Sequence, residues 1–187
     1  PVYLGRYPVE GMELYKNYLP EITQADMDLI HQPIDFCAHN TYNGRAFSMN
    51  EDGRPVFVRR PTGSPRTDMH WPVTPPALRW GPRFLYERYK LPIVITENGM
   101  AAHDTISLDG KVHDPNRIDY MNRYLLELEK ATADGIDIRG YFAWSLMDNF
   151  EWSEGYMPRF GLIYVDYATQ TRIIKDSGHW YKAWIME

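Results

Sequence analysis

Apolar and polar positions alternate along the chain in blocks that predict helices and buried strands in turn. Apolar residues at helical spacing predict helices over 9–19, 74–90 and 114–135, with shorter helices beginning at Thr23 and Ser177. Runs rich in β-branched residues predict strands over 34–42, 92–97 and 138–146, and the 92–97 run is typical of a strand buried on both faces. A hairpin is predicted from 161–166 and 172–175, and the turn at 50–53 belongs to an irregular loop or a second hairpin.

Local signals mark where several of these helices begin. Thr23, followed three residues later by Asp26, has the pattern of a capping box. Thr74, placed before two prolines, and Ser177 are typical N-cap residues. Gly81-Pro82 is expected to break or restart the helix that follows Thr74.

The alternation of strands and helices predicts an α/β fold with a parallel sheet and right-handed crossovers. Three such strands are fewer than a doubly wound sheet usually has, and an eight-stranded barrel usually needs about 250 residues. The predicted architecture is therefore part of a (β/α)8 barrel. Since Pro1 is not an initiator methionine, we expect the chain to begin in the middle of a longer protein.

The composition excludes several classes of protein. The chain has 187 residues, of which 44% are hydrophobic and 24% charged, so it is neither disordered nor fibrous. A formal net charge of −5 argues against nucleic acid as a partner, and no apolar stretch reaches the roughly 18 residues of a membrane span. The lone Cys37 excludes an internal disulfide, and the histidines lack metal-binding spacing, so no metal and no cofactor are expected. No Asn-X-Ser/Thr site occurs, which favours a cytoplasmic, bacterial location while leaving the compartment open.

Two carboxylates near predicted strand ends are candidates for chemistry. Glu97 follows a β-branched run directly, and a buried charge costs several kcal/mol unless it is paired or hydrogen-bonded. Position alone leaves Glu97 open to two interpretations, a functional acid or a helix-capping or salt-bridged loop residue. Glu151 stands between Phe150 and Trp152, where spacing alone favours a solvated loop acid beside core aromatics.

Several motifs, taken together, resemble glycoside hydrolase family 1, the β-glucosidase family. The segment 95–99, Ile-Thr-Glu-Asn-Gly, is similar to the nucleophile signature of that family, and 144–152 is similar to its sugar-binding stretch. Further matches lie at 5–8, 35–42, 159–166 and 175–181, in the family's order. The resemblance covers essentially the whole chain and implies the C-terminal portion, residues 1–187, of a single barrel domain.

The resemblance implies catalytic roles for two residues. Glu97 would be the nucleophile of a retaining double displacement, forming a covalent glycosyl-enzyme. Tyr42 matches the family tyrosine that donates a hydrogen bond to the nucleophile, although a barrel-rim aromatic is the plain alternative. Asn40 falls at a family position near the catalytic pair and is carried over as a substrate-binding residue.

Four further residues are implied to bind substrate. Glu151 would accept hydrogen bonds from two hydroxyls of the non-reducing sugar, Trp152 would add an indole N–H donor, and Trp144 would stack against the sugar. Phe160 would line the pocket, with core packing as its alternative. Trp71 either joins the aglycone wall or packs under its loop.

The chain departs from the family in lacking the Asn-Glu-Pro motif that carries the acid/base carboxylate. A retaining glycosidase needs two carboxyl groups about 5–5.5 Å apart. Glu151 could supply the second carboxyl, but the resemblance assigns it to substrate hydroxyls. We therefore expect the acid/base residue to lie upstream of this chain, and the isolated chain to aggregate or to pair with its missing N-terminal half.

The resulting hypothesis is a retaining β-glucosidase acting on terminal non-reducing β-D-glucosyl residues, with a β-glucoside or cello-oligosaccharide as substrate. The alternatives are a sugar-binding scaffold and a catalytically incomplete fragment. The sequence leaves the glycone preference, the natural aglycone and the oligomeric state open.

Overall fold

The computed structural model describes residues 1–186, and a three-stranded parallel sheet forms the centre of this part of the chain. Its strands are β1 (Cys37–Asn40), β4 (Ile93–Asn98) and β5 (Ile138–Ala143), in the order β1-β4-β5. Helix α3 (Ala77–Tyr89) precedes β4, and helix α4 (Pro115–Ala133) connects β4 to β5. The predicted parallel alternation of strands and helices is therefore confirmed.

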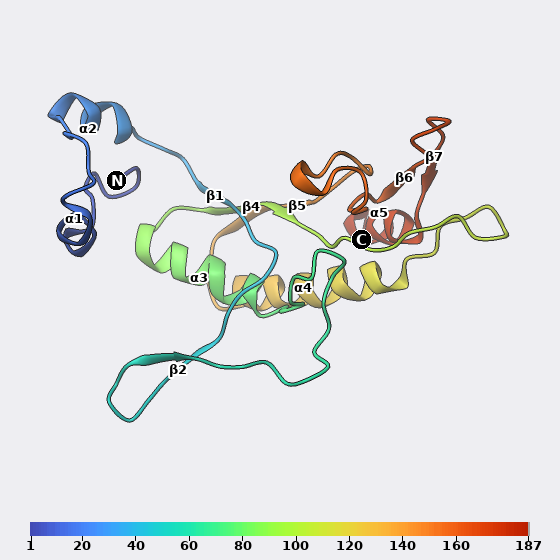
Figure 1. The fold of residues 1–187 in the computed structure, drawn as a ribbon, viewed down its shortest axis with the longest axis horizontal. Helices are drawn as coiled ribbons and strands as arrows, with labels where there is room; N and C mark the ends of the chain where they lie inside the picture. The colour runs from blue at the N-terminus through green and yellow to red at the C-terminus, as the bar shows by residue number, and fades with distance from the viewer. Residues whose placement is uncertain (187) are drawn as a thin grey trace.

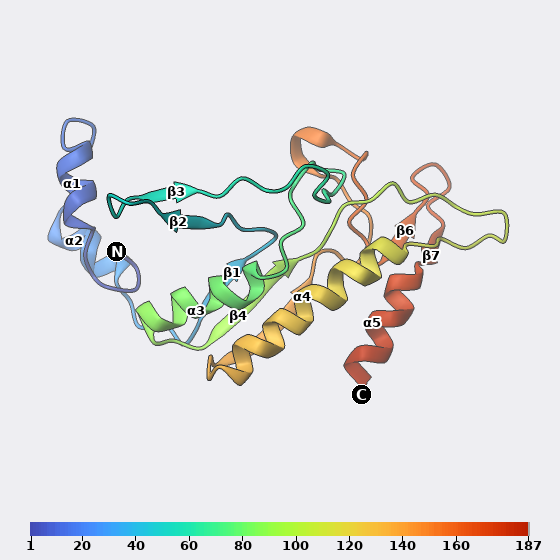
Figure 2. The same cartoon turned by 90° about the horizontal axis from the view of Figure 1, so that it is seen from below.

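Helices cover one face of this sheet. Figures 1 and 2 show α3 and α4 side by side along the sheet, and α5 (Asp176–Met186) packs against α4. Ile93 and Ile95 of β4 are fully buried in the core under these helices. Removing such aliphatic side chains from water is the main stabilising contribution to the sheet–helix packing.

The opposite face of the sheet is open. Ala38 and Thr96 are exposed on it, and Phe142 is 60% exposed. Side chains alternate along a strand, so these residues lie opposite the buried Ile93 and Ile95. The prediction of a 92–97 strand buried on both faces is therefore wrong for the described residues, because their helices cover one face only.

Two antiparallel hairpins flank the sheet. One consists of β2 (Phe47–Met49) and β3 (Pro55–Phe57), joined through the predicted turn at 50–53, and it projects from the body of the molecule (Figure 2). The other, β6 (Ile163–Val165) with β7 (Arg172–Ile174), leads into α5 and confirms the second predicted hairpin.

The N-terminal helices α1 (Val9–Tyr15) and α2 (Gln24–Ile30) lie together at one end of the molecule (Figure 1). Helix α2 begins at the predicted capping box. The Asp26 N–H donates to Thr23 Oγ1 at 3.2 Å, and the Thr23 N–H donates to Asp26 Oδ2 at 2.9 Å. Helix α1 ends at Tyr15, four residues before the predicted end of its pattern.

Three local predictions at helices are wrong because distant contacts override them. Thr74 lies three residues before α3, and its Oγ1 accepts a hydrogen bond from the Gly44 N–H at 2.9 Å. Ser177 lies inside α5, and its Oγ donates to Asp114 at 2.5 Å. Pro82 does not break α3, because it is buried with Leu78 in a helix that continues past the missing N–H.

The parallel strands end at one edge of the sheet, where their backbones approach closely. Asn40 pairs with Glu97, and Asn98 pairs with Ala143. A Cβ added at Gly99 would lie 1.8 Å from the Trp144 carbonyl oxygen, a distance that no side chain can occupy. Glycine at this position therefore allows the segments that follow β4 and β5 to meet.

Gly99→Ala is expected to lower the free energy of unfolding by at least about 3 kcal/mol, because its methyl group collides with backbone. Gly81→Ala is the matched control, since Gly81 lies in α3 with open space around the added carbon. This control should stabilise the protein by about 0.5–1 kcal/mol. Urea unfolding of both variants tests the close approach, and equal effects would contradict it.

Candidate active site

A phenol and a carboxylate meet at the carboxyl ends of β1 and β4. Tyr42 Oη donates a hydrogen bond to Glu97 Oε2 over 2.5 Å. Glu97 stands on β4, Tyr42 follows β1 by two residues, and the Thr41 N–H donates to the Glu97 carbonyl at 2.9 Å. The pairing of two parallel strands thus brings together side chains that are 55 positions apart in the sequence.

Tyr42 is held in its protonated form. Burial raises the pKa of Tyr42 well above its usual range, and the hydrogen bond to Glu97 and the charges of Glu97 and Glu151 raise it further. The phenol therefore remains a donor at neutral pH. A neutral donor orients the carboxylate without cancelling the negative charge that a nucleophile needs.

Aromatic rings surround Tyr42. Its ring lies 5.1 Å from that of Trp71 and 6.3 Å from that of Phe160, and the Trp71 and Phe160 rings are 5.9 Å apart. Phe160 is 2% exposed among the described residues, and its ring packs against that of Tyr42 from the interior of the protein. The sequence left two interpretations open for Trp71. In the structure Trp71 packs directly on Tyr42 and belongs to the same aromatic cluster as Phe160.

Asn40 lies at the end of β1, with its Oδ1 accepting a hydrogen bond from Thr96 Oγ1 at 2.7 Å. Both residues are exposed on the open face of the sheet. The structure therefore places Asn40 beside the strand that carries Glu97 and leaves its amide N–H₂ directed away from that bond.

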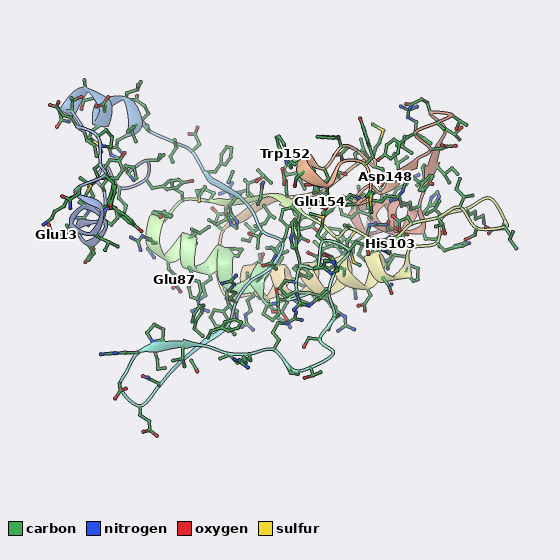
Figure 3. All side chains as sticks on the ribbon, in the orientation of Figure 1. Glu13, Glu87, His103, Asp148, Trp152 and Glu154 are labelled. Atoms are coloured by element: carbon green, nitrogen blue, oxygen red, sulfur yellow. The ribbon has the colours of Figure 1, made fainter. Side chains whose placement is uncertain are left out.

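The loop after β5 brings Trp144 and Glu151 together. Burial raises the pKa of Glu151, a hydrogen bond from the Trp144 side chain lowers it, and the negative charges of Glu97 and Glu154 raise it. Glu151 therefore lies close enough to Glu97 for their charges to interact. Trp152 opens the short 3₁₀ helix η1 (Trp152–Glu154), is 80% exposed and projects from this loop (Figure 3).

A cluster of buried ions fixes the loops around this site. Its members come from the segments after β4 and β5, from the first turn of α4 and from the residue before α5, and they are Asp104, Asp114, Asp148, Arg117, Arg159 and Lys175. Three carboxylates and three cations balance in formal charge. Such balance is what allows ionised side chains to be buried, because an unpaired one costs several kcal/mol.

Lys175 joins the two halves of this ion cluster. Its Nζ donates to Asp104 Oδ2 at 2.5 Å and to Asp148 Oδ1 at 2.8 Å. Burial lowers the pKa of Lys175, and the neighbouring Arg117 lowers it further, while the two carboxylates raise it. Arg159 completes the link, bonding Asp148 at 2.6 Å with its guanidinium 4.0 Å from the Tyr164 ring centroid.

Among residues 1–186, no three His, Cys, Asp or Glu side chains are arranged to hold a metal ion. In the same part of the chain, every helix is too short or too polar to cross a membrane.

The motifs at the strand ends match one family along the whole chain. The family model described as glycosyl hydrolase family 1 matches residues 1–187. The chain belongs to glycosyl hydrolase family 1. The resemblance stated from residues 95–99 and 144–152 is therefore confirmed.

Curated family 1 proteins give the nature of the relatives. Beta-glucosidase A of Thermotoga maritima is 46% identical over 184 residues, which cover 97% of this chain and 41% of the relative. A bifunctional beta-D-glucosidase/beta-D-fucosidase of Bifidobacterium breve is 42% identical, covering all of this chain and 45% of the relative. The chain thus spans about two fifths of the length of the curated relatives it matches.

Solved structures agree with this placement. The chain superimposes on the family 1 β-glucosidase of Thermotoga maritima with a TM-score of 0.88 at 44% identity, covering 100% of this chain and 42% of that one. The same enzyme in complex with glucoimidazole gives a TM-score of 0.88 at 45% identity, with the same coverage. The β/α units of this family 1 chain are therefore part of a (β/α)8 barrel, as the sequence predicted.

Sequence reasoning missed the residues beneath the site. Tyr120 and Tyr124 of α4 both donate hydrogen bonds to the Tyr42 carbonyl, at 3.0 and 2.9 Å, and Asn98 connects this network to β4. In the sequence the two tyrosines are indistinguishable from ordinary core aromatics.

Lys175→Met is expected to lower the free energy of unfolding by about 3 kcal/mol, because it leaves Asp104 and Asp148 buried with an excess of negative charge. Lys182→Met, on the exposed side of α5, is the control and should change it by less than about 0.5 kcal/mol. Urea denaturation measures both. Equal midpoints for the two variants would show that the ion cluster does not stabilise the fold.

Trp144→Phe is expected to raise the pKa of Glu151, because it removes the indole donor that stabilises the ionised carboxylate. Glu97→Gln should lower the pKa of Glu151, because it removes a neighbouring negative charge. Carboxyl ¹³C NMR titration of Glu151 gives both directions. A shift of the same sign in the two variants would be inconsistent with this geometry.

Proposed function

We propose that this chain carries the nucleophile and part of the sugar-binding site of a retaining β-glucosidase that removes terminal non-reducing β-D-glucosyl residues. The observation that carries the proposal is the 2.5 Å hydrogen bond from Tyr42 to Glu97 at the carboxyl ends of β1 and β4. This is the edge at which parallel barrels place their catalytic groups. Relatives named beta-glucosidase A, at 41–46% identity, and one named a bifunctional beta-D-glucosidase/beta-D-fucosidase, at 42%, support the substrate class.

The first chemical step assigned to Glu97 is attack on the anomeric carbon. A carboxylate oxygen of Glu97 forms a bond to that carbon while the glycosidic C–O bond breaks, and the electron pair leaves with the aglycone oxygen. Tyr42 keeps the other carboxylate oxygen occupied through its hydrogen bond, so the attacking oxygen is presented in one orientation. Water then attacks the anomeric carbon, the carbon–oxygen bond to Glu97 breaks to regenerate the carboxylate, and the proton of the water passes to the acid/base group that lies outside this chain.

Sugar recognition is assigned to the loop after β5 and to the end of β1. Glu151 accepts hydrogen bonds from sugar hydroxyls, Trp152 donates its indole N–H, and Trp144 presents an apolar ring face. Asn40 offers its free amide N–H₂ at the open face, and Phe160 supports the pocket from below. The partial burial and raised pKa of Glu151 fit an acceptor that becomes fully paired when sugar binds.

The proton for the departing aglycone is assigned to a carboxyl group outside residues 1–187. No Asn-Glu-Pro sequence occurs in the chain, and the chain covers about two fifths of its relatives. We therefore propose that residues 1–187 form the C-terminal portion of one barrel domain. The open face of the sheet, with Phe142 60% exposed, is the surface that the remaining β/α units would cover.

An activated 2-deoxy-2-fluoro-β-glucoside tests the assignment of Glu97. Its good leaving group needs no acid, and the fluorine slows release of the trapped sugar. We expect the complete barrel, with this chain joined to its upstream portion, to gain one fluoroglucosyl group, which peptide mapping places on Glu97. The chain alone is treated in parallel, and labelling of the chain alone would show that residues 1–187 suffice for the first step.

Two variants make this labelling decisive. Glu97→Gln should abolish the adduct, whereas Glu87→Gln, at an exposed position of α3, should leave labelling unchanged. An adduct on another residue, or persistent labelling of Glu97→Gln, would overturn the nucleophile assignment. Saturable sugar binding by the complete barrel without labelling or hydrolysis would favour a sugar-binding scaffold instead.

A further inference from the structure

The backbone of Tyr42 is clamped by two phenols from α4. Tyr120 Oη and Tyr124 Oη donate to the Tyr42 carbonyl oxygen at 3.0 and 2.9 Å, so both acceptor positions of that carbonyl are filled. The two rings are stacked, with centroids 4.0 Å apart and an interplanar angle of 21°. Each phenol therefore also fixes the position of the other.

Further hydrogen bonds hold the phenols themselves. Asn98 Nδ2 donates to Tyr120 Oη at 3.2 Å and to the Thr41 carbonyl at 2.8 Å, and Asn98 Oδ1 accepts from Tyr141 Oη at 2.8 Å. The Thr74 N–H donates to Tyr124 Oη at 2.8 Å. Asn98 is fully buried and follows Glu97 directly, so the network begins beside one member of the pair and ends on the backbone of the other.

The direction of these bonds is fixed by protonation. Burial raises the pKa of Tyr120, and the adjacent Tyr124 raises it further, while the hydrogen bond from Asn98 opposes the shift. Burial likewise raises the pKa of Tyr141. The Tyr120 and Tyr141 phenols therefore keep their protons at neutral pH and donate as described.

We propose that Tyr120 and Tyr124 are positioning residues that hold the Tyr42 hydroxyl against the Glu97 carboxylate. Resting on the proposed function, this assigns to α4 a role in the reaction, although neither phenol reaches the substrate side of the site. Tyr42 is constrained at three points. Two phenols hold its backbone carbonyl, Trp71 and Phe160 pack against its ring, and Glu97 accepts a hydrogen bond from its hydroxyl. Loss of the first constraint lets the hydroxyl drift, and misplacing a catalytic contact by about 1 Å can cost on the order of 10²-fold in rate.

A double-mutant cycle on the complete barrel tests this role. Tyr120→Phe removes one donor to the carbonyl and should lower kcat for an aryl β-glucoside about three- to tenfold, with little change in KM. Tyr42→Phe should lower it about 10- to 100-fold, because it removes a hydrogen bond to a charged group. In the Tyr42→Phe background, Tyr120→Phe should change kcat by less than about twofold, since no hydroxyl is left to misplace.

The carboxyl ¹³C chemical shift of Glu97 gives a readout independent of turnover. Tyr42→Phe and Tyr120→Phe should move this shift in the same direction. In the Tyr42→Phe background, Tyr120→Phe should move the shift no further. Tyr124→Phe repeats the test through the other donor, in case Tyr120→Phe fails to fold. Tyr181→Phe is the matched control. Tyr181 packs on Tyr141 from α5, and its hydroxyl has no hydrogen bond among residues 1–186.

Each outcome separates this proposal from the proposed function. Additive effects of Tyr42→Phe and Tyr120→Phe on kcat, or a Glu97 shift unmoved by both Tyr120→Phe and Tyr124→Phe, would overturn the positioning role. A wild-type barrel that neither hydrolyses the substrate nor is labelled would defeat the proposed function alone. The change in the Glu97 ¹³C chemical shift caused by Tyr120→Phe and Tyr42→Phe would still report on positioning. Loss of kcat in Tyr181→Phe equal to that in Tyr120→Phe would show a general packing effect and would also sink the proposal.

Discussion

Ion pairs within the buried cluster hold the loops that shape the site, because every ion in that cluster must be paired. Asp104 follows β4, Asp148 follows β5, and Lys175 immediately precedes α5, so each charge finds its partner on a different segment. An ionised group left unpaired at such depth costs several kcal/mol, so these segments cannot separate independently. The loop that bears Glu151 and Phe160 is consequently tied to the C-terminal hairpin and helix.

Helix α4 links this ion cluster to the pair formed by Tyr42 and Glu97. Arg117, Tyr120 and Tyr124 are all buried and lie at spacings of three and four residues, which places them on one face of the helix. Arg117 bonds Asp104 at 2.7 Å and the Arg159 carbonyl at 2.7 Å, while the tyrosines bond the Tyr42 carbonyl. One rigid element therefore sets the position of the loops through charges and the position of Tyr42 through neutral hydrogen bonds. Because the donors at Tyr42 are neutral, they leave the negative charge of Glu97 uncompensated. The proposed role of Glu97 requires that charge.

The sequence predicted the elements whose signals are local and the site residues that stand at strand ends. The capping box at Thr23 and the parallel strands were accessible in this way, whereas the contact between Tyr42 and Glu97 followed from the resemblance to family 1. Thr74 and Ser177 misled the prediction because their hydroxyls bind residues 30 and 63 positions away, and no local pattern carries that information. Tyr120 and Tyr124 were overlooked for the same reason, since an aromatic at helical spacing predicts core packing whether or not its hydroxyl has a distant acceptor.

The two faces of the sheet divide the proposed reaction between this chain and the rest of the barrel. Beneath the strand ends, the described contacts that orient Glu97 run from the Tyr42 hydroxyl down to Asn98 and α4. Above them, Phe142 is 60% and Trp152 80% exposed, and the chain offers no Asn-Glu-Pro carboxylate. The hydrogen bonds that hold the Tyr42 hydroxyl on Glu97 thus lie within residues 1–186, whereas the proposed enclosure of the sugar and protonation of the leaving group need the rest of the barrel. Both the ion cluster and the phenol network join segments that are far apart within residues 1–186, so this portion of the barrel fixes the Tyr42–Glu97 contact through its own side chains.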